Sequence, residues 1–200
     1  MKRIGLIGGV GTGKSIVADI LEKYFNSFVI KADTVGHEII KKGTPSYQLI
    51  VDYFGKEILN SEEEIDRSKL GPIVMNEKTK LNKLNSFTHP FIYDYIKNQV
   101  LKTMSEGSYQ YIVIEVPLMI EAGFDDLVDE NWYIHTDLEI RKQRLKDSRN
   151  YSDEKINSIL SNQLSDEKYR ENANYEIDNN GEIDETVQQI KDILSGGKYD

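Results

Sequence analysis

The sequence predicts an α/β fold with a doubly wound, five-stranded parallel sheet, and three observations support this. First, five short runs rich in β-branched and aromatic residues alternate with helical patterns. We expect the strands at residues 3–7, 27–31, 111–116, 132–136 and 174–178. Second, a glycine-rich segment, 8–15, joins the first strand to a helix. Third, the gaps after the second and fourth strands are longer than one crossover helix needs, which indicates two helical excursions from the sheet.

These gaps divide the chain into three expected parts. The core comprises residues 1–33, 111–136 and 171–200, and a helical, substrate-binding insertion occupies 34–110. A charged helical lid occupies 137–170. In the insertion we expect helices over 44–54, 68–75, 77–85 and 90–104, and in the lid near 138–148 and 152–164. Ser152 is the expected cap of the second lid helix, with acidic residues in its first turn.

The glycine-rich segment matches the pattern G-x-x-x-x-G-K-[ST] in full. In such a loop, backbone N–H groups surround a polyphosphate, Lys14 reaches the β- and γ-phosphates, and the Ser15 hydroxyl binds Mg²⁺. The following helix directs its N-terminus at the anion. A glycine turn without a ligand is the alternative, but the strand and helix on either side favour a nucleotide site. The expected ATP-binding residues of the loop are Val10, Gly11, Thr12, Gly13, Lys14 and Ser15.

The composition excludes several classes of protein. Apolar residues make up 38% and charged residues 30%, which is typical of a soluble globular domain. No apolar run is long enough to span a bilayer, no signal peptide is expected, and cysteine is absent, so we expect a cytoplasmic protein without disulfides. The net charge of −9 argues against nucleic-acid binding. An anionic substrate must therefore meet local clusters of arginine and lysine.

Further motifs follow the loop in a fixed order. They are Ile30-Lys31-Ala32-Asp33, His37-Glu38, Gly43-Thr44-Pro45, Phe54-Gly55, Asp66-Arg67-x-x-Leu70-Gly71, His89-Pro90, Val116-Pro117-Leu118 with Glu121, and Ile177-Asp178-Asn179-Asn180-Gly181. From about residue 3 to about residue 190 this series resembles the dephospho-CoA kinase family. The resemblance implies a sheet of P-loop kinase type and Mg²⁺-dependent transfer of phosphate from ATP to the ribose 3′-hydroxyl of dephospho-CoA. The products are CoA and ADP, in the last step of CoA biosynthesis. We expect a monomer or a weak homo-oligomer.

The resemblance implies that Asp33 orients or deprotonates the acceptor hydroxyl. We expect it at the carboxyl end of a strand adjacent to the loop strand, where doubly wound sheets bind ligands. Alternatively, Asp33 caps a helix that starts at Thr34. The family usually has Asp-Ala-Asp here, whereas this chain has Lys31 at the first position. In an extended segment Lys31 and Asp33 share a face, so the cation would lower the pKa of Asp33 and leave it mainly an orienting role.

The resemblance also assigns residues to the acceptor. Arg67, His89, Pro117, Leu118 and Glu121 match family positions near it. Arg67 is equally suited to a diphosphate or to an ion pair with a carboxylate of the protein. His89, which precedes Pro90, is as well suited to ending a turn before the next helix. Four aromatic residues are candidates for stacking on adenine, although aromatics at helical spacing are more often core: Tyr47, Phe54, Phe87 and Phe91.

Arg144 matches a lid position that reaches the ATP phosphates, and with Lys14 and Asp33 it completes the expected catalytic set. The family's second lid arginine corresponds to Ser148 here. Either the helix ends before Arg149 and frees it, or Arg141 takes its place one turn earlier. The alternative for these arginines is a solvated ion pair with Glu139 or Asp147.

Two further residues have both a functional and a structural interpretation. Glu115 ends an apolar strand, where it is suited to an Mg²⁺ contact through water or to an ion pair. Asn179 matches the turn that holds the adenine of ATP in the family, but Asn-Asn-Gly also makes a turn without a ligand.

Three rival functions remain on the residues alone. Another small nucleoside or nucleotide kinase shares the loop, insertion and lid, but the motifs at 43–45, 66–71 and 89–90 do not suit it. A switch GTPase needs an N-K-x-D segment at a strand end, and the sequence has none there. A non-catalytic nucleotide-binding regulator would account for Lys31 and the shifted lid arginine.

Overall fold

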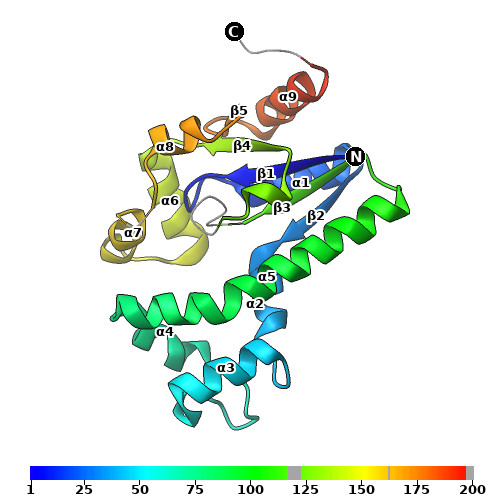
Figure 1. Ribbon diagram of the computed structural model, residues 1–200. Helices are drawn as coiled ribbons and strands as arrows, with labels where there is room; N and C mark the ends of the chain where they lie inside the picture. The colour runs from blue at the N-terminus through cyan, green and yellow to red at the C-terminus, as the bar shows by residue number, and fades with distance from the viewer. Residues whose placement is uncertain (117–122, 162, 197–200) are drawn as a thin grey trace. The chain divides into compact units, whose positions relative to one another are not determined.

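The computed structural model describes residues 1–116, 123–161 and 163–196 of the 200-residue chain. The chain forms two compact units. Figure 1 shows the elements of both, coloured by residue number. Unit 1 comprises Met1–Ile30 and Thr103–Asp200, and unit 2 comprises Lys31–Lys102. The segment expected to be a lid groups with the sheet in unit 1, so its separate movement remains a proposal.

The sheet has five strands in the order β2-β3-β1-β4-β5. The strands are β1 (Lys2–Ile7), β2 (Ser27–Lys31), β3 (Tyr111–Glu115), β4 (Glu130–His135) and β5 (Tyr175–Asp178). β1 pairs in parallel with β3 and β4, and β4 pairs in parallel with β5, which confirms the predicted doubly wound sheet. β3 lies between β1 and β2, so the expectation that the strand before Asp33 adjoins the loop strand is wrong. Sequence neighbours need not be sheet neighbours when a crossover reaches past one position.

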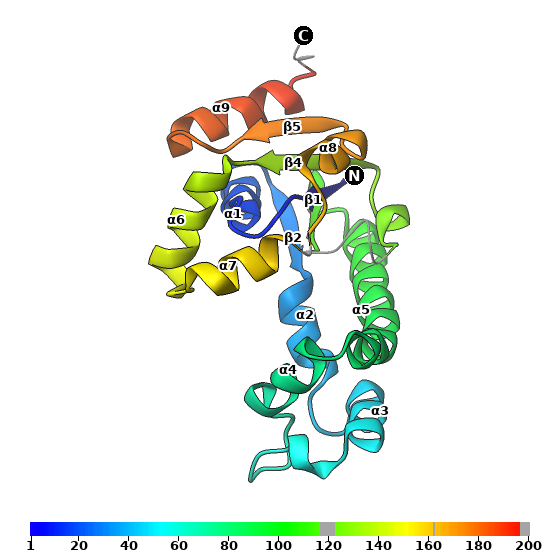
Figure 2. The same ribbon diagram turned by 90° about the vertical axis from the view of Figure 1, so that its left-hand side faces the viewer.

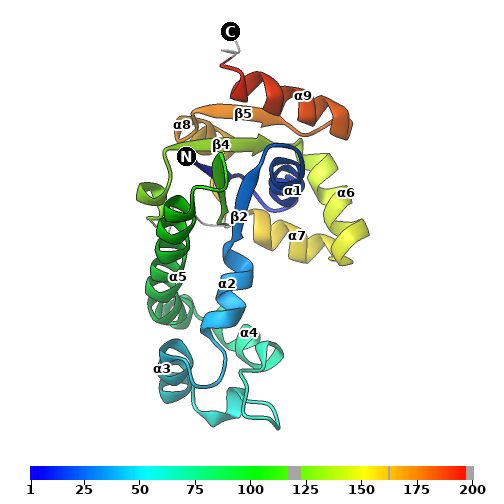
Figure 3. The same cartoon turned by 90° about the vertical axis from the view of Figure 1, so that its right-hand side faces the viewer.

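The residues of β4 alternate between the two faces of the sheet, as a pleated strand requires. Trp132 and Ile134 pack in the core that α1 (Lys14–Tyr24) and α9 (Ile183–Leu194) form on one face. On the other face Tyr133 stacks on Tyr169 of α8 (Asp166–Glu171), with ring centroids 5.5 Å apart. Figures 2 and 3 show α9 lying along β5. Helices therefore lie on both faces of the sheet, and the middle residues of its central strands are buried and mostly apolar.

Two copies of one tetrapeptide begin two helices of unit 1. Besides α6 (Leu138–Arg149) and α8, this region contains α7 (Asp153–Leu160) and the 3₁₀ helix η2 (Asp125–Leu127). Ser-Asp-Glu-Lys occurs at 152–155 and again at 165–168, and in each copy the serine hydroxyl accepts the lysine backbone N–H at 3.3 Å. The first cap is confirmed. The second was missed, and α7 ends four residues earlier than the predicted helix.

Unit 2 is helical. It contains α2 (Ala32–Ile39), α3 (Pro45–Phe54), η1 (Lys56–Ile58), α4 (Arg67–Met75) and most of α5 (Lys78–Glu106). Thr44 caps α3 by accepting the N–H of Tyr47, with Pro45 in the first turn. Tyr47 and Phe54 are each less than 10% exposed, so they are core residues of this unit. Within the described ranges, no helix is both long and apolar enough to cross a bilayer.

The prediction of separate helices over 77–85 and 90–104 is wrong, because α5 continues through Pro90. Proline has no N–H to donate to the carbonyl of Ser86, four residues before it, and its ring crowds that turn. The hydroxyl of Ser46, a residue only 1% exposed, donates to the Phe87 carbonyl at 2.9 Å. Tertiary packing thus supports the helix at the turn where proline weakens it.

Candidate active site

The phosphate-binding loop lies between β1 and α1, at the carboxyl end of the strand where the sheet order reverses. Gly13 is the N-cap of α1, with a φ of +91° that favours glycine. A Cβ atom on Gly13 would lie 2.1 Å from Nδ2 of Asn179 and 3.7 Å from a terminal nitrogen of Arg144. The loop backbone is therefore closely approached by the side chains around it.

The two chemically active side chains of the loop already have partners. Lys14 Nζ donates to the carbonyls of Gly8 at 2.7 Å and Gly9 at 2.9 Å, so the ammonium lies over the loop. The Ser15 hydroxyl donates to Oε1 of Glu115 at 2.6 Å, because Glu115 ends β3 directly beside β1.

A hydroxyl beside a carboxylate suits Mg²⁺, which takes oxygen ligands and keeps several waters. Among the described residues no cluster of three or more His, Asp, Glu or Cys side chains is arranged to hold a metal by itself. The Ser15–Glu115 pair therefore fits Mg²⁺ that arrives with a nucleotide and takes its remaining ligands from phosphate and water.

Asn179 fixes the backbone of the loop. Its Nδ2 donates to the Thr12 carbonyl at 2.8 Å, and its Oδ1 accepts the Thr186 hydroxyl at 3.1 Å. The Thr136 hydroxyl donates to the same Thr12 carbonyl at 3.0 Å. Asn179 is only 3% exposed, so its side chain is engaged inside the protein. That this turn also binds the adenine of ATP remains a prediction. Since the Asn179 side chain is engaged, its contact with adenine would come from the backbone.

Two arginines of α6 reach the loop. Arg141, 7% exposed, donates from Nε to the Val10 carbonyl at 3.1 Å. Arg144 donates to the Asn179 carbonyl at 2.9 Å and to the Thr136 hydroxyl at 3.4 Å. Their expected carboxylate partners bind other side chains: Glu139 binds Lys142, and Asp147 accepts from Gln143.

The position of Arg149 decides between the two alternatives for the second lid arginine. α6 continues through Arg149 and ends at Asn150, which has left-handed backbone geometry. The prediction that the helix ends earlier and frees Arg149 is therefore wrong. Its guanidinium carbon lies 6.0 Å from the centre of the Tyr151 ring, in an exposed position. Arg141, one turn before Arg144, is the arginine that the helix places at the loop.

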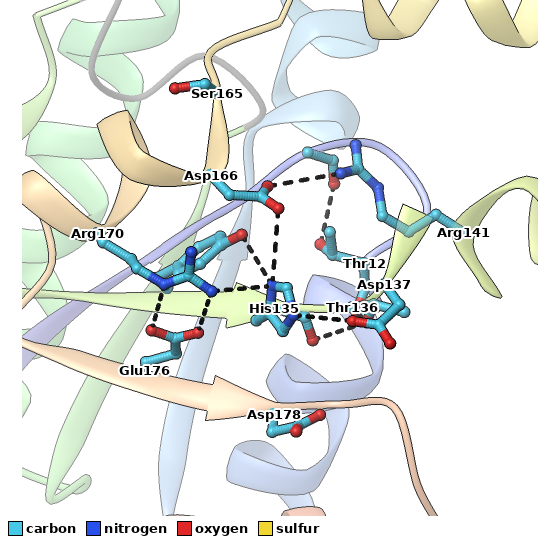
Figure 4. A network of polar contacts seen from close by, with 12 residues as sticks. Thr12, His135, Thr136, Asp137, Arg141, Ser165, Asp166, Arg170, Glu176 and Asp178 are labelled. Atoms are coloured by element: carbon cyan, nitrogen blue, oxygen red, sulfur yellow. Dashed lines mark hydrogen bonds and ion pairs between the residues drawn. The ribbon is translucent and has the colours of Figure 1, made fainter. Parts of the chain in front are cut away.

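Beside the arginines lies a polar network that the sequence did not reveal (Figure 4). His135, at the end of β4, contacts Asp137 at 3.2 Å through Nε2 and the Tyr133 hydroxyl at 3.2 Å through Nδ1. Arg170 forms a two-bond ion pair with Glu176 at 2.8 and 2.9 Å. Burial and a hydrogen bond with Asp166 raise the pKa of Tyr133, which keeps its hydroxyl protonated. The signal in the sequence that could have revealed this network is the run of polar side chains at the alternate positions Tyr133, His135 and Asp137.

In unit 2, Arg67 borders an apolar cavity of about 250 Å³. It begins α4 after its cap Asp66, and its guanidinium lies 2.5 Å from Nε2 of His37. The cavity is lined by Gly36, Ile40, Ile50, Arg67, Leu70, Gly71, Val74, Leu84, Asn85, Thr88 and Ile92. His89 is not among these residues, and burial lowers its pKa. The cavity brings Arg67 together with Leu70 and Gly71 of the same motif.

Asp33 lies exposed in the first turn of α2, immediately after β2. The helix starts at Ala32 with Lys31 as its N-cap, so the interpretation of Asp33 as a cap is wrong. The argument that Lys31 and Asp33 share a face also fails, since it assumed an extended chain where the backbone is helical. Pro117, Leu118 and Glu121 lie outside the described residues.

The chain is similar to several known kinases. Residues 2–185 match the model of the dephospho-CoA kinase family. A dephospho-CoA kinase from Carboxydothermus hydrogenoformans is 37% identical, over 98% of this chain and 94% of that relative. The solved dephospho-CoA kinase from Campylobacter jejuni is 27% identical and superimposes with a TM-score of 0.69 over 98% of both chains. A shikimate kinase from Acinetobacter baumannii, 16% identical, has a similar fold, with a TM-score of 0.58 over 100% of this chain and 96% of its own. A family match that extends over nearly the whole chain, on a fold shared with other small kinases, means that the chain belongs to the dephospho-CoA kinase family.

Proposed function

We propose that this protein phosphorylates the ribose 3′-hydroxyl of dephospho-CoA with ATP, giving CoA and ADP. The family match supports the substrates. The observation that carries the mechanism is the convergence of Lys14, Arg141 and Arg144 on one glycine-rich loop, in a chain whose net charge is −9. A local cluster of cations in an acidic protein is what a triphosphate requires. No finding favours the rival nucleotide kinases or the non-catalytic regulator.

On the donor side, phosphoryl transfer needs positioning and charge stabilisation more than covalent chemistry. Lys14 exchanges the carbonyls of Gly8 and Gly9 for phosphate oxygens, at little cost because its ammonium already lies at the loop. Arg144 stabilises the charge that develops on the transferred group. The Ser15 hydroxyl and the Glu115 carboxylate would hold Mg²⁺. When bound, the ion would supply positive charge against the phosphates.

On the acceptor side, Asp33 orients the 3′-hydroxyl and accepts its proton. Its exposure in the first turn of α2 leaves the carboxylate accessible to a substrate. Arg67 supports acceptor binding, since a guanidinium at the wall of an apolar cavity suits a molecule that joins phosphates to a neutral arm. Pro117, Leu118 and Glu121 are proposed for the acceptor on the resemblance alone, and so is His89.

The decisive assay measures ADP release from ATP and Mg²⁺ with dephospho-CoA, beside AMP, adenosine and no acceptor. We expect ADP with dephospho-CoA alone, and CoA in equal amount. ADP formation with AMP or adenosine would instead indicate a nucleotide or nucleoside kinase. ATP binding without turnover on any acceptor would indicate the regulator.

The proposed role of Asp33 has its own test. Asp33→Asn keeps the size of the side chain but removes its capacity as a base, and we expect kcat to fall by on the order of 10²–10⁴. ATP affinity should not change, because Asp33 is assigned to the acceptor. Full turnover in this variant would limit Asp33 to a structural role.

A further inference from the structure

One side chain joins the phosphate-binding loop to the lid arginine. The Oε1 atom of Gln163, between α7 and α8, accepts the backbone N–H of Val10 at 3.1 Å. The same oxygen accepts a terminal N–H of Arg141 at 3.1 Å. Arg141 in turn donates from Nε to the Val10 carbonyl at 3.1 Å. The three residues therefore form a closed ring of hydrogen bonds, which we call the Gln163 clamp.

In the clamp, the side-chain oxygen of Gln163 is fully used as an acceptor. A carboxamide oxygen has two lone pairs, and both are engaged by Val10 and Arg141. The other terminal nitrogen of Arg141 lies 3.8 Å from Oδ1 of Asp166, within ion-pair range but beyond a hydrogen bond. Figure 4 shows this contact, which joins Arg141 to Asp166. This nitrogen therefore keeps hydrogen-bonding capacity that the clamp does not use.

Gly9 gives independent evidence that Arg141 and Gln163 approach the loop backbone closely. A Cβ atom at this position would lie 2.1 Å from a terminal nitrogen of Arg141 and 2.8 Å from Oε1 of Gln163. No residue type is specified at this position by the pattern G-x-x-x-x-G-K-[ST]. A side chain at this position would therefore have to displace the ends of both partners.

We propose that Gln163 is a positioning residue of the nucleotide site: its carboxamide oxygen holds Arg141 against the loop, ready to bind the triphosphate of ATP. The inference rests on the proposed function only in naming ATP as the ligand. Removing Gln163 leaves the Val10 N–H unpaired and releases the guanidinium from its fixed orientation. Binding must then order the arginine, and this costs affinity.

The test is a double-mutant cycle on nucleotide affinity. Gln163→Ala, Arg141→Ala and the double variant are titrated with a non-hydrolysable ATP analogue and Mg²⁺, without acceptor. We expect each single change to weaken binding on the order of tenfold, as the loss of a charge-assisted hydrogen bond implies. The double variant should be little worse than Arg141→Ala, because the glutamine acts through the arginine. Gln143→Ala, on the exposed side of α6 where Gln143 bonds Asp147, is the matched control and should bind normally.

A second variant separates positioning from folding. Gly9→Ala leaves every hydrogen-bonding group in place yet should weaken binding as Gln163→Ala does, with no further loss when the two are combined. Trp132 fluorescence checks that each variant remains folded, since this tryptophan is fully buried in the sheet of unit 1. Normal affinity in Gln163→Ala, or effects that add in the double variant, would overturn the proposal. Because no turnover is measured, a wild-type protein inactive on dephospho-CoA would overturn the proposed function and leave this result standing.

Discussion

Asn179 offers the sharpest test of how the loop is held in place. Its amide joins the Thr12 carbonyl, 2.8 Å away, to the Thr186 hydroxyl, 3.1 Å away, in an almost fully buried position. Asn179→Ala removes both bonds and leaves the Thr186 hydroxyl without its partner, whereas the Thr12 carbonyl keeps the Thr136 hydroxyl. At about 1 kcal/mol for each bond, plus part of a desolvation penalty, the free energy of unfolding should fall by about 2–3 kcal/mol. For a chain of this length that corresponds to a melting temperature lower by roughly 5–10 °C.

The assay follows the fluorescence of Trp132, the chain's single tryptophan, during urea and thermal unfolding. Because Trp132 lies in β4, the signal reports the unit that contains Asn179. The neighbouring Asn180→Ala is the control, since Asn180 is only partly buried and accepts one backbone N–H, that of Asp137, at 2.7 Å. Asn180→Ala should lower the free energy of unfolding by less than half as much as Asn179→Ala. Equal losses in the two variants would refute the assignment of a special structural role to Asn179.

The pH dependence of Asn179→Asp extends this test. The substitution replaces the amide donor with an oxygen that faces the Thr12 carbonyl, so the folded state should raise the pKa of the new carboxyl above about 3.9. The Arg144 guanidinium, which donates to the backbone oxygen of residue 179, and the Thr186 hydroxyl act against this rise. The folded variant then binds more protons than the unfolded chain, so its stability falls as pH rises from about 4 through the raised pKa. A deficit relative to wild type that does not grow with pH would contradict this reasoning.

Three further predictions concern single sites. Gly13→Ala should abolish binding of the ATP analogue and lower the melting temperature. The reason is that a Cβ atom there meets Nδ2 of Asn179 at 2.1 Å, on a backbone with φ +91°. Near-normal binding would contradict this loop geometry. Ser46→Ala should lower the stability of unit 2 by about 1–2 kcal/mol, measured by hydrogen exchange in α5, since the Phe87 carbonyl loses a buried donor; unchanged exchange would mean that water replaces the hydroxyl. His89→Gln should flatten the pH dependence of stability below about pH 6.5. Burial lowers the pKa of His89 in the folded protein, so the unfolded chain binds more protons as pH falls. Melting curves from pH 5 to 8 that match those of wild type would exclude this contribution.

Several motifs that carried the resemblance begin and end helices. Asp66 caps α4 by accepting the N–H of Ser68 at 2.9 Å, and Thr44 with Pro45 starts α3. Gly55 ends α3, donating its N–H to the Val51 carbonyl at 2.9 Å with a φ of +84°. Such residues identify the family through its fold. They tell little about its chemistry.

The sequence alone determined the sheet, the phosphate-binding loop and the cap at Ser152, because each depends on local patterns of backbone propensity and side-chain chemistry. It assigned Ser15 and Glu115 separately to Mg²⁺, and the structure places the two side chains 2.6 Å apart. That this pair binds the metal remains a prediction. Monomeric or weakly associated behaviour and a cytoplasmic location remain predictions.

Only the tertiary structure decided the order β2-β3-β1, the passage of α5 through Pro90 and the placement of Arg141, rather than Arg149, at the loop. Each depends on contacts between residues far apart in the chain, which local propensity does not encode. The Gln163 clamp is the clearest case: Val10 and Gln163 are 153 positions apart, and one oxygen joins them only because the segment between α7 and α8 lies beside the loop.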